Sequence, residues 1–220
     1  MHIDIITTLP PMFTGPLTES IVKRASEKGI VHIRIHDLRN WTSDKHRTTD
    51  DHPYGGGPGM VMMVEPIHKA LQELNAEKGA PRQLIVLTSA KGGLFVQQTA
   101  QKWSAQLDRL VIICGHYEGV DERVAKYLVD EEVRIGNFIV TGGELPAAVM
   151  VDAVVRLLPG ALGDETSIQD ESHAIPGYME YPQYTRPENY QSWEVPKILL
   201  GGNHKDIATW RKEQSSKTTD

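Results

Sequence analysis

Short apolar runs alternate with helical patterns along most of the chain, and this alternation restricts the possible folds more than any other feature. Such runs, apolar or alternating polar and apolar, are typical of strands. The strand-like runs are His2–Ile6, Val31–Ile35, Leu84–Leu87, Leu110–Ile113 and Phe138–Val140. The helical segments span residues 16–28, 65–78, 96–107, 120–128 and 146–158. Strands that alternate with helices indicate an α/β fold, with a parallel sheet covered by helices on both faces.

The character of the sequence changes after Gly163. Residues 164–172 are polar and acidic, which is typical of a linker, and residues 176–220 are rich in proline, tyrosine and glycine. One helical segment remains near Asp206–Arg211. We expect a main domain over residues 1–160, a linker over residues 161–175 and a small domain over residues 176–220.

Composition places the chain among globular proteins. Hydrophobic residues make up 40%, enough to form a core, and no apolar run approaches the roughly 18 residues of a membrane-spanning helix. Met1–Asp4 does not resemble a signal sequence, so we expect a soluble, cytoplasmic protein. A formal net charge of −6 argues against a nucleic-acid partner, although a local basic face is still compatible with one. Lys45, His46 and Arg47 form such a local cluster.

Two glycine-bearing turns follow strand-like runs between Cys114 and Ala147. One contains Gly115 and the other contains Gly142 and Gly143. Glycine at a strand end lets the backbone approach a bound small molecule closely. The two turns together predict one ligand pocket built from several loops. Cys114, the only cysteine, ends an apolar run, so we expect a buried core thiol rather than a nucleophile.

A glycine-rich loop spans Pro53–Met60. It is not a phosphate-binding P-loop, because no Gly-Lys-Ser/Thr sequence follows the glycines. It is either a flexible surface turn or, beside the cations at 45–47, a loop whose amides lie against a phosphate backbone.

Three groups of charged residues have both a structural and a functional interpretation. Arg156 lies four residues after Asp152 on a predicted helix and either pairs with it or stabilises negative charge that develops in a reaction. Asp170 and Glu171 are either solvated linker acids or include a general base. Glu118 is either an acid favoured at a helix N-terminus or a ligand contact.

Five motifs occur in order along the chain and together carry a resemblance. They are Asp50–Met60, Cys114–Arg123, Ile135–Phe138 with Thr141–Pro146, Tyr184–Pro187, and Gly202–His204 followed by Trp210–Arg211. In these motifs the chain closely resembles the bacterial tRNA (guanine-N1)-methyltransferases of the SPOUT superfamily, from Met1 to about Ser215.

The resemblance implies a SPOUT domain over residues 1–160, with a deep trefoil knot over about residues 84–160, and a shortened, helical tRNA-binding domain over residues 176–220. It implies an obligate homodimer with active sites at the subunit interface. The substrate would be tRNA, methylated on N1 of the guanosine 3′ of the anticodon (position 37). The methyl donor would be S-adenosylmethionine, with a requirement for Mg2+ at a site that the sequence does not reveal.

The resemblance also assigns residues to the site. Arg156 matches the arginine that faces guanine O6. The cofactor-binding residues would be Leu87, Thr88, Ser89, Gly115, Tyr117, Glu118, Ile135, Gly136, Asn137, Phe138, Ile139, Val140, Gly142, Gly143 and Pro146. The tRNA-binding residues would be Lys45, His46, Arg47, Tyr54, Gly55, Gly56, Gly57 and Gly59.

The catalytic base would be a linker carboxylate supplied by the partner subunit. The family has Asp-Ser-Phe at this position, whereas this chain has Asp170, Glu171, Ser172 and His173. Counting from Pro159 favours Glu171, and a one-residue shift selects Asp170. The altered base segment leaves a second hypothesis, a non-catalytic relative that binds tRNA or cofactor without turnover. A nucleotide hydrolase is disfavoured, because the sequence has neither a phosphate-binding lysine motif nor a cluster of metal ligands.

Overall fold

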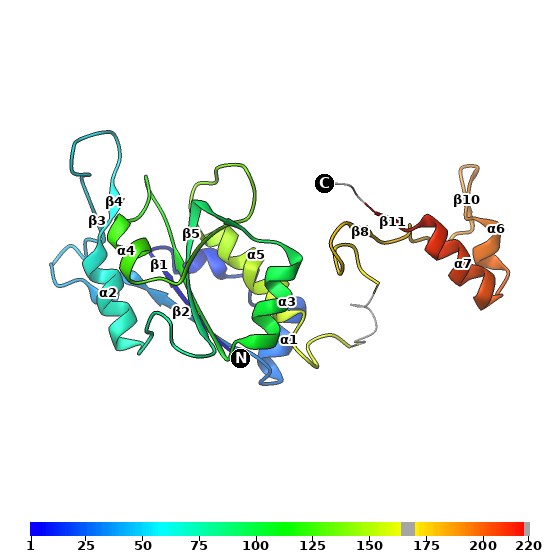
Figure 1. The fold of residues 1–220 in the computed structure, drawn as a ribbon, viewed down its shortest axis with the longest axis horizontal. Helices are drawn as coiled ribbons and strands as arrows, with labels where there is room; N and C mark the ends of the chain where they lie inside the picture. The colour runs from blue at the N-terminus through cyan, green and yellow to red at the C-terminus, as the bar shows by residue number, and fades with distance from the viewer. Residues whose placement is uncertain (164–169, 218–220) are drawn as a thin grey trace. The chain divides into compact units, whose positions relative to one another are not determined.

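Five parallel strands form the central sheet of the computed structural model, which describes residues 1–163 and 170–217 (Figure 1). Their spatial order is β2-β1-β6-β5-β7, and every neighbouring pair is parallel. The strands are β1 (His2–Thr7), β2 (His32–Asp37), β5 (Gln83–Leu94), β6 (Arg109–Cys114) and β7 (Glu131–Arg134). The predicted α/β fold with a parallel sheet is confirmed.

Helices cover both faces of this sheet, as the sequence pattern predicted. On β6, Leu110 and Ile112 face one hydrophobic cluster, whereas Val111 and Ile113 face the other, because successive side chains of a strand point to opposite faces. One cluster includes residues of α1 (Ser20–Glu27), α3 (Gln97–Gln106) and α5 (Glu144–Val155). The other includes residues of the 3-10 helix η2 (Leu38–Trp41), α2 (Val64–Glu73) and α4 (Glu122–Tyr127).

The prediction of a strand at Phe138–Val140 is wrong. These residues form an exposed loop, with Ile139 82% exposed, and the fifth strand is β7, at Glu131–Arg134. Since β7 carries three charged residues in four, its sequence does not have the apolar pattern of a buried strand. The apolar residues at 138–140 belong instead to the wall of a cavity described below.

Strand β5 is much longer than predicted and contains an irregularity. Val133 of β7 is the partner of both Thr88 and Gly93, so the intervening residues of β5 bulge out of the ladder. Gly92 permits this path, because a Cβ there would lie 2.3 Å from the backbone carbon of Glu132. The bulge carries Ser89, Ala90 and Lys91 to the carboxyl end of the sheet.

Asp4 of β1 is a fully buried carboxylate in this sheet. Arg34 Nε and Arg109 Nε each donate to it at 2.9 Å, and His36 Nε2 lies 2.8 Å from Asp4 Oδ1. Burial raises the pKa of Asp4, but the hydrogen bonds from His36, Arg109 and Arg34 outweigh burial and bring the pKa well below its usual value. The histidine therefore belongs to an ion cluster within the sheet.

The contacts divide the chain into two units, residues 1–163 and 164–220. Unit 1 also holds the 3-10 helix η1 (Pro10–Phe13) and an antiparallel hairpin of β3 (Asp50–Asp51) and β4 (Val61–Met62). In unit 2, β8 (Tyr178–Met179) pairs with β11 (Ser216–Lys217), and β9 (Asn189–Tyr190) pairs with β10 (Trp193–Glu194). Its helices are α6 (Lys197–Leu200) and α7 (His204–Gln214), and α7 contains the predicted helical segment.

Residues 164–169 of the predicted linker lie outside the described residues. Among the described helices, none has the length and apolar character needed to cross a membrane.

Candidate functional site

A cavity of about 500 Å3 opens at the carboxyl ends of β5, β6 and β7. Its wall combines the β5 bulge, the turn after β6 and the loop between β7 and α5. The lining residues are Leu87, Thr88, Ser89, Ala90, Lys91, Gly115, His116, Tyr117, Glu118, Gly119, Val120, Ala125, Glu132, Val133, Arg134, Ile135, Gly136, Phe138, Ile139, Val140, Thr141, Gly142, Gly143 and Pro146. Ligands of parallel α/β proteins commonly bind at this end of the sheet.

Bare backbone forms the floor of the cavity where three segments meet. Gly143 donates its amide to the Gly115 carbonyl at 2.6 Å, and Gly115 donates its amide to Thr88 Oγ1 at 2.9 Å. A Cβ at Gly143 would lie 1.8 Å from Thr88 Oγ1, so only glycine fits. The start of α5 is thereby fixed against the ends of β5 and β6.

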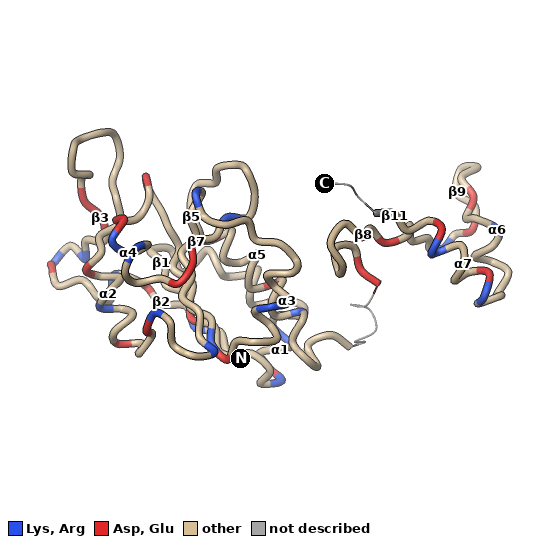
Figure 2. Tube along the Cα trace, viewed as in Figure 1, with Lys and Arg blue, Asp and Glu red and all other residues tan. Residues whose placement is uncertain are grey.

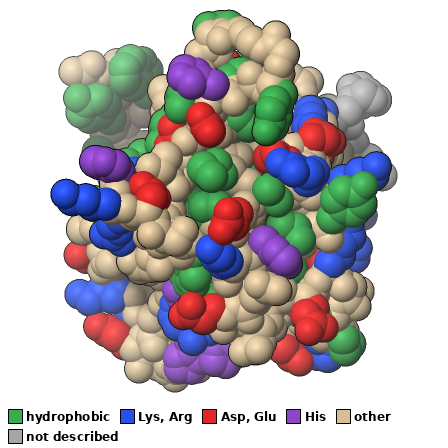
Figure 3. Space-filling model, turned by 90° about the vertical axis from the view of Figure 1, so that its left-hand side faces the viewer, with side chains coloured by type: hydrophobic (Ala, Val, Ile, Leu, Met, Phe, Trp, Pro, Cys, Tyr) green, Lys and Arg blue, Asp and Glu red, His purple; other side chains and the backbone are tan. Residues whose placement is uncertain are grey.

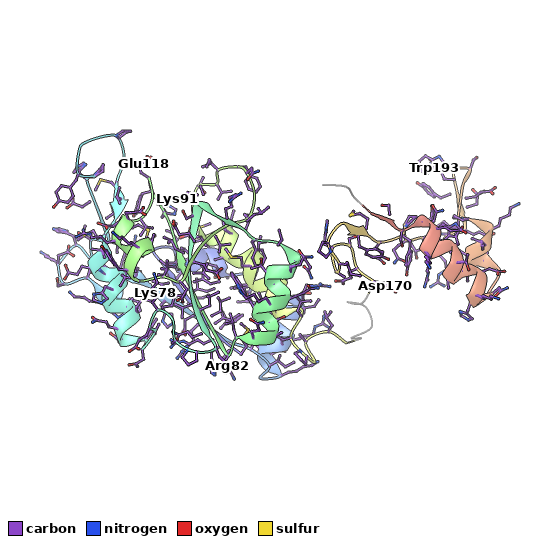
Figure 4. All side chains as sticks on the ribbon, viewed as in Figure 1. Lys78, Arg82, Lys91, Glu118, Asp170 and Trp193 are labelled. Carbon is purple, nitrogen blue, oxygen red and sulfur yellow. The ribbon has the colours of Figure 1, made fainter. Side chains whose placement is uncertain are left out.

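The structure brings together fourteen of the fifteen residues predicted to bind the cofactor, all of which line this cavity. Asn137 is the exception and does not line the cavity. Its side-chain oxygen accepts a hydrogen bond from Arg134 Nε at 3.1 Å. Glu118, predicted as either a helix N-terminal acid or a ligand contact, is exposed, lines the cavity and lies at the same end of unit 1 as Lys91 (Figure 4).

A buried carboxylate supports the turn after β6. Glu144, the first residue of α5, is 1% exposed and accepts a hydrogen bond from the Thr7 hydroxyl at 2.8 Å. Its other oxygen lies 3.3 Å from Nδ1 of His116, which lines the cavity. These contacts link the end of β1, the start of α5 and the cavity wall.

The glycine-rich loop is attached to the same cavity wall. Glu118 donates its amide to the Met60 carbonyl at 3.0 Å, and Met62 donates to the Gly119 carbonyl at 3.0 Å. A Cβ at Gly59 would lie 2.3 Å from Glu118 Cγ, so a side chain at this position would displace the carboxylate. The predicted tRNA-binding loop and the predicted cofactor-binding turn are therefore in direct contact.

Tyr117 makes a further connection between these two segments. Its backbone has a φ of +58°, which is uncommon for a residue other than glycine. Its pKa is raised, first by burial and then by a hydrogen bond and the negative charge of Asp50, at the base of the β3–β4 hairpin.

The other predicted tRNA-binding residues lie on the surface of unit 1. Tyr54 is fully exposed at the tip of the glycine-rich loop, where Gly55, Gly56 and Gly57 all have positive φ angles. Lys45 and His46 are exposed, and Arg47 Nη2 donates to Asn40 Oδ1 at 2.6 Å. On the face shown in Figure 3, basic and acidic side chains are interspersed.

The predicted catalytic residues lie outside the cavity wall of unit 1. Arg156 follows the last residue of α5, thirteen residues beyond Gly143, which is about 20 Å along a helix. Asp170 and Glu171 belong to unit 2, where Asp170 is exposed and Glu171 is partly buried. Within unit 1, Arg156 therefore lies away from the cavity wall.

Comparison with known proteins gives the family. The family described as tRNA (Guanine-1)-methyltransferase TrmD matches residues 1–220. A tRNA (guanine-N(1)-)-methyltransferase from Geobacter sp. (strain M21) is 52% identical over 219 residues, covering 100% of this chain and 86% of the relative. Proteins of the same name from Dictyoglomus turgidum and Geobacillus kaustophilus are each 50% identical over 219 residues, covering 100% of this chain and 86% and 88% of the relatives. The chain belongs to the tRNA (guanine-1)-methyltransferase family.

Ten further residues line the cavity and were not predicted from the sequence: Ala90, Lys91, His116, Gly119, Val120, Ala125, Glu132, Val133, Arg134 and Thr141. His116, Gly119 and Val120 lie within the motif Cys114–Arg123, beside residues that were predicted to bind the cofactor, so their position in the sequence could have indicated them. Lys91 and Glu132 gave no such signal, because the bulge of β5 and the polar strand β7 bring them to the cavity.

No group of three His, Cys, Asp or Glu side chains suited to hold a metal ion occurs among residues 1–163 and 170–217.

Proposed function

We propose that the chain transfers a methyl group from S-adenosylmethionine to N1 of the guanosine 3′ of the anticodon, position 37, in tRNA. The observation that supports this most strongly is the glycine-floored cavity at the strand ends, in a chain whose relatives are named tRNA (guanine-N(1)-)-methyltransferases. The same relatives disfavour the non-catalytic alternative.

The cavity suits the proposed methyl donor. Its volume of about 500 Å3 lies in the range of small-molecule sites. Exposed backbone at Gly115, Gly142 and Gly143 can bind the polar edges of the donor, and apolar side chains such as Ile135 and Val140 can cover its adenine ring. When bound, S-adenosylmethionine supplies the methyl group from its sulfonium.

Three groups of this chain would act on guanine. Loss of the N1 proton places negative charge on O6, and the guanidinium of Arg156 would stabilise that charge through hydrogen bonds. Glu171, or Asp170 as the alternative, would accept the N1 proton as general base. The walls of the cavity would hold the guanine ring in line with the methyl group of the donor and exclude water, so that positioning supplies much of the rate acceleration.

A homodimer would complete the proposed site, with the donor cavity and the general base on different subunits. On α5, one helix face carries Leu145, Val149, Asp152 and Arg156, and Leu145 and Val149 remain 50% and 49% exposed. The opposite faces of α5 are buried in the core. A second copy packed on this face would bury its two exposed apolar side chains and approach the arginine at its end. We propose that this dimer is obligate and that the base comes from the partner subunit.

Three finer assignments belong to the same proposal. We propose a trefoil knot over about residues 84–160, and the close passage of Gly143 between Thr88 and Gly115 supports it. We propose that the basic cluster at 45–47, the glycine-rich loop and residues 176–220 bind tRNA. We also propose a requirement for Mg2+ and a cytoplasmic location.

Subunit complementation tests this arrangement. Gly143→Ala damages the cavity, and Glu171→Gln removes the base, so each homodimer should form little N1-methylguanosine. Co-expression of the two variants with different tags gives a mixture in which about half the dimers are mixed. Each mixed dimer holds one intact site, with the cavity from one subunit and the base from the other. The unfractionated mixture should therefore recover about a quarter of the wild-type rate. Inactive mixed dimers, with both variants folded, would contradict a base supplied by the partner.

A further inference from the structure

A second cavity, of about 620 Å3, lies within unit 2. Helix α7 contributes Arg211 and Lys212 to its wall, and Tyr178 and Tyr181 contribute aromatic rings. Figure 2 shows the basic positions along α7. Basic side chains beside aromatic rings are typical of grooves that bind single-stranded nucleic acid, where the cations contact phosphates and the rings contact bases. The cavity therefore has the composition of a nucleotide-binding site.

The two basic side chains of this cavity have no acidic partner. In unit 1, exposed cations such as Lys69 and Arg82 are ion-paired at 2.6 Å. Among the described residues, no carboxylate forms an ion pair with Arg211 or Lys212. The guanidinium carbon of Arg211 lies 4.7 Å from the centre of the Tyr181 ring, and this cation–π contact holds the side chain in place. Both cations can therefore bind an anion, and phosphate is the anion that tRNA supplies.

The segment that carries both candidate bases is attached to the same cavity. Asp170 lines the cavity. Ser172 Oγ accepts a hydrogen bond from the Glu180 amide at 3.0 Å, and His173 donates its amide to the Tyr178 carbonyl at 2.7 Å, so the segment is held on β8. Strand β8 pairs with β11, which follows α7. The candidate bases therefore lie close to the basic side chains of α7.

We infer that the cavity of unit 2 binds the tRNA backbone next to the target guanosine, with Arg211 and Lys212 on a phosphate. The inference rests on the proposed function, because it assumes that tRNA is the substrate and that this segment supplies the base. It adds the part of the tRNA that unit 2 holds, which is the strand beside the methylated nucleotide. Since the cations and the candidate bases belong to one folded unit, binding of the backbone places the base near the guanosine.

Binding of two RNAs to the full chain over a range of salt concentrations tests the inference. One RNA is tRNA with guanosine 3′ of the anticodon, and the other is its isolated anticodon stem-loop. Lys212→Gln changes an exposed residue and should fold normally. We expect it to weaken binding of both RNAs by about 3- to 10-fold and to reduce the slope of log Kd against log salt concentration by about 1, as for one lost phosphate contact. The value of kcat at saturating tRNA and the affinity for S-adenosylhomocysteine should stay within about twofold of wild type.

Two further variants serve as controls. Lys102→Gln makes the same change of charge at an exposed lysine of α3 in unit 1, and should leave the affinities and the salt slope close to those of wild type. Lys212→Arg keeps the positive charge at the cavity and should bind both RNAs nearly as well as wild type.

Three results would overturn the inference. An unchanged affinity and salt slope in Lys212→Gln would mean that this cavity does not hold the backbone. A loss with tRNA but not with the stem-loop would assign the cations to a distant part of the tRNA. Equal losses in Lys102→Gln would indicate a general effect of net charge. Each of these leaves the proposed function in place if the wild-type protein methylates the tRNA. If wild-type protein neither binds nor methylates it, the proposed function itself fails.

Discussion

Gly143 and Thr88 lie so close that a Cβ on the glycine would stand 1.8 Å from the threonine hydroxyl oxygen. This contact joins the start of α5 to the end of β5 at the floor of the cavity. Gly143→Ala should therefore push these segments apart, lowering the free energy of unfolding by about 1–3 kcal/mol and weakening S-adenosylhomocysteine binding. Urea unfolding and calorimetry measure the two effects.

Gly93→Ala is the control for that change. A Cβ at Gly93 would meet its nearest neighbour, the Glu132 carbonyl oxygen, at 3.8 Å, which is an ordinary van der Waals distance. It should leave ligand affinity close to that of wild type. Equal losses in both variants would show that the close contact at Gly143 has no special role.

Asp4→Asn should be strongly destabilising. The substitution leaves Arg109 and His36 near a buried neutral group, and breaking a buried ion cluster in this way costs about 3–5 kcal/mol. Urea unfolding at pH 7 measures the loss. A change below about 0.5 kcal/mol, as for an ordinary surface substitution, would contradict the assigned role of this cluster.

The contribution of Asp4 should also depend on pH. Its pKa in the folded chain is lower than in the unfolded chain, where aspartate titrates near about 3.9. The stabilisation is therefore fully present well above pH ~4 and is lost as the pH falls toward the folded pKa. The difference in unfolding free energy between wild type and Asp4→Asn should shrink below about pH 4. If the difference in unfolding free energy between wild type and Asp4→Asn stayed constant from pH 7 to 3, the assigned role of Asp4 would be wrong.

Cys114 should be unreactive in the folded protein. Its side chain is completely buried, and its pKa is raised first by burial and then by the negative charge of Glu144, so the reactive thiolate is disfavoured. A colorimetric thiol reagent at pH 8 should react with one equivalent of thiol only after denaturation. Rapid reaction of the native protein would place Cys114 in an open site.

Much of the fold was predictable because its signals are local. The apolar runs at β1, β5 and β6 indicated the parallel sheet, and Gly115 after β6 indicated the end of the sheet where the cavity lies. Strand β7 was not predictable in this way, because its charged residues lack the apolar pattern of a strand and form one only by pairing with β5. The loop at 138–140 was misread because its apolar side chains line a cavity instead of the core.

The parts of the site that escaped prediction depend on contacts between distant residues. Lys91 reaches Glu132 only because of a register shift between β5 and β7, and periodicity carries no information about such shifts. Similarly, Glu144 is held by Thr7, 137 residues earlier in the chain. The choice between Asp170 and Glu171 concerns a segment whose partners in the active site would come from another subunit.

Separate substitutions should distinguish the two candidate bases. Glu171 is partly buried, whereas Asp170 is exposed, and a base for a weakly acidic proton is helped by desolvation. Glu171→Gln should lower kcat by about 10²- to 10⁴-fold and leave S-adenosylhomocysteine affinity unchanged, while Asp170→Asn should have a small effect. The opposite pattern would assign the base to Asp170, and full activity of both variants would exclude this segment.

Methylation of two matched tRNA transcripts tests the central claim most directly. The transcripts differ only 3′ of the anticodon, where one has guanosine and the other adenosine, and each is incubated with labelled S-adenosylmethionine and Mg2+. The account predicts labelled N1-methylguanosine in digests of the guanosine transcript and no label in the other. Failure to form N1-methylguanosine from a transcript that an active control enzyme methylates, or equal labelling of both transcripts, would contradict it.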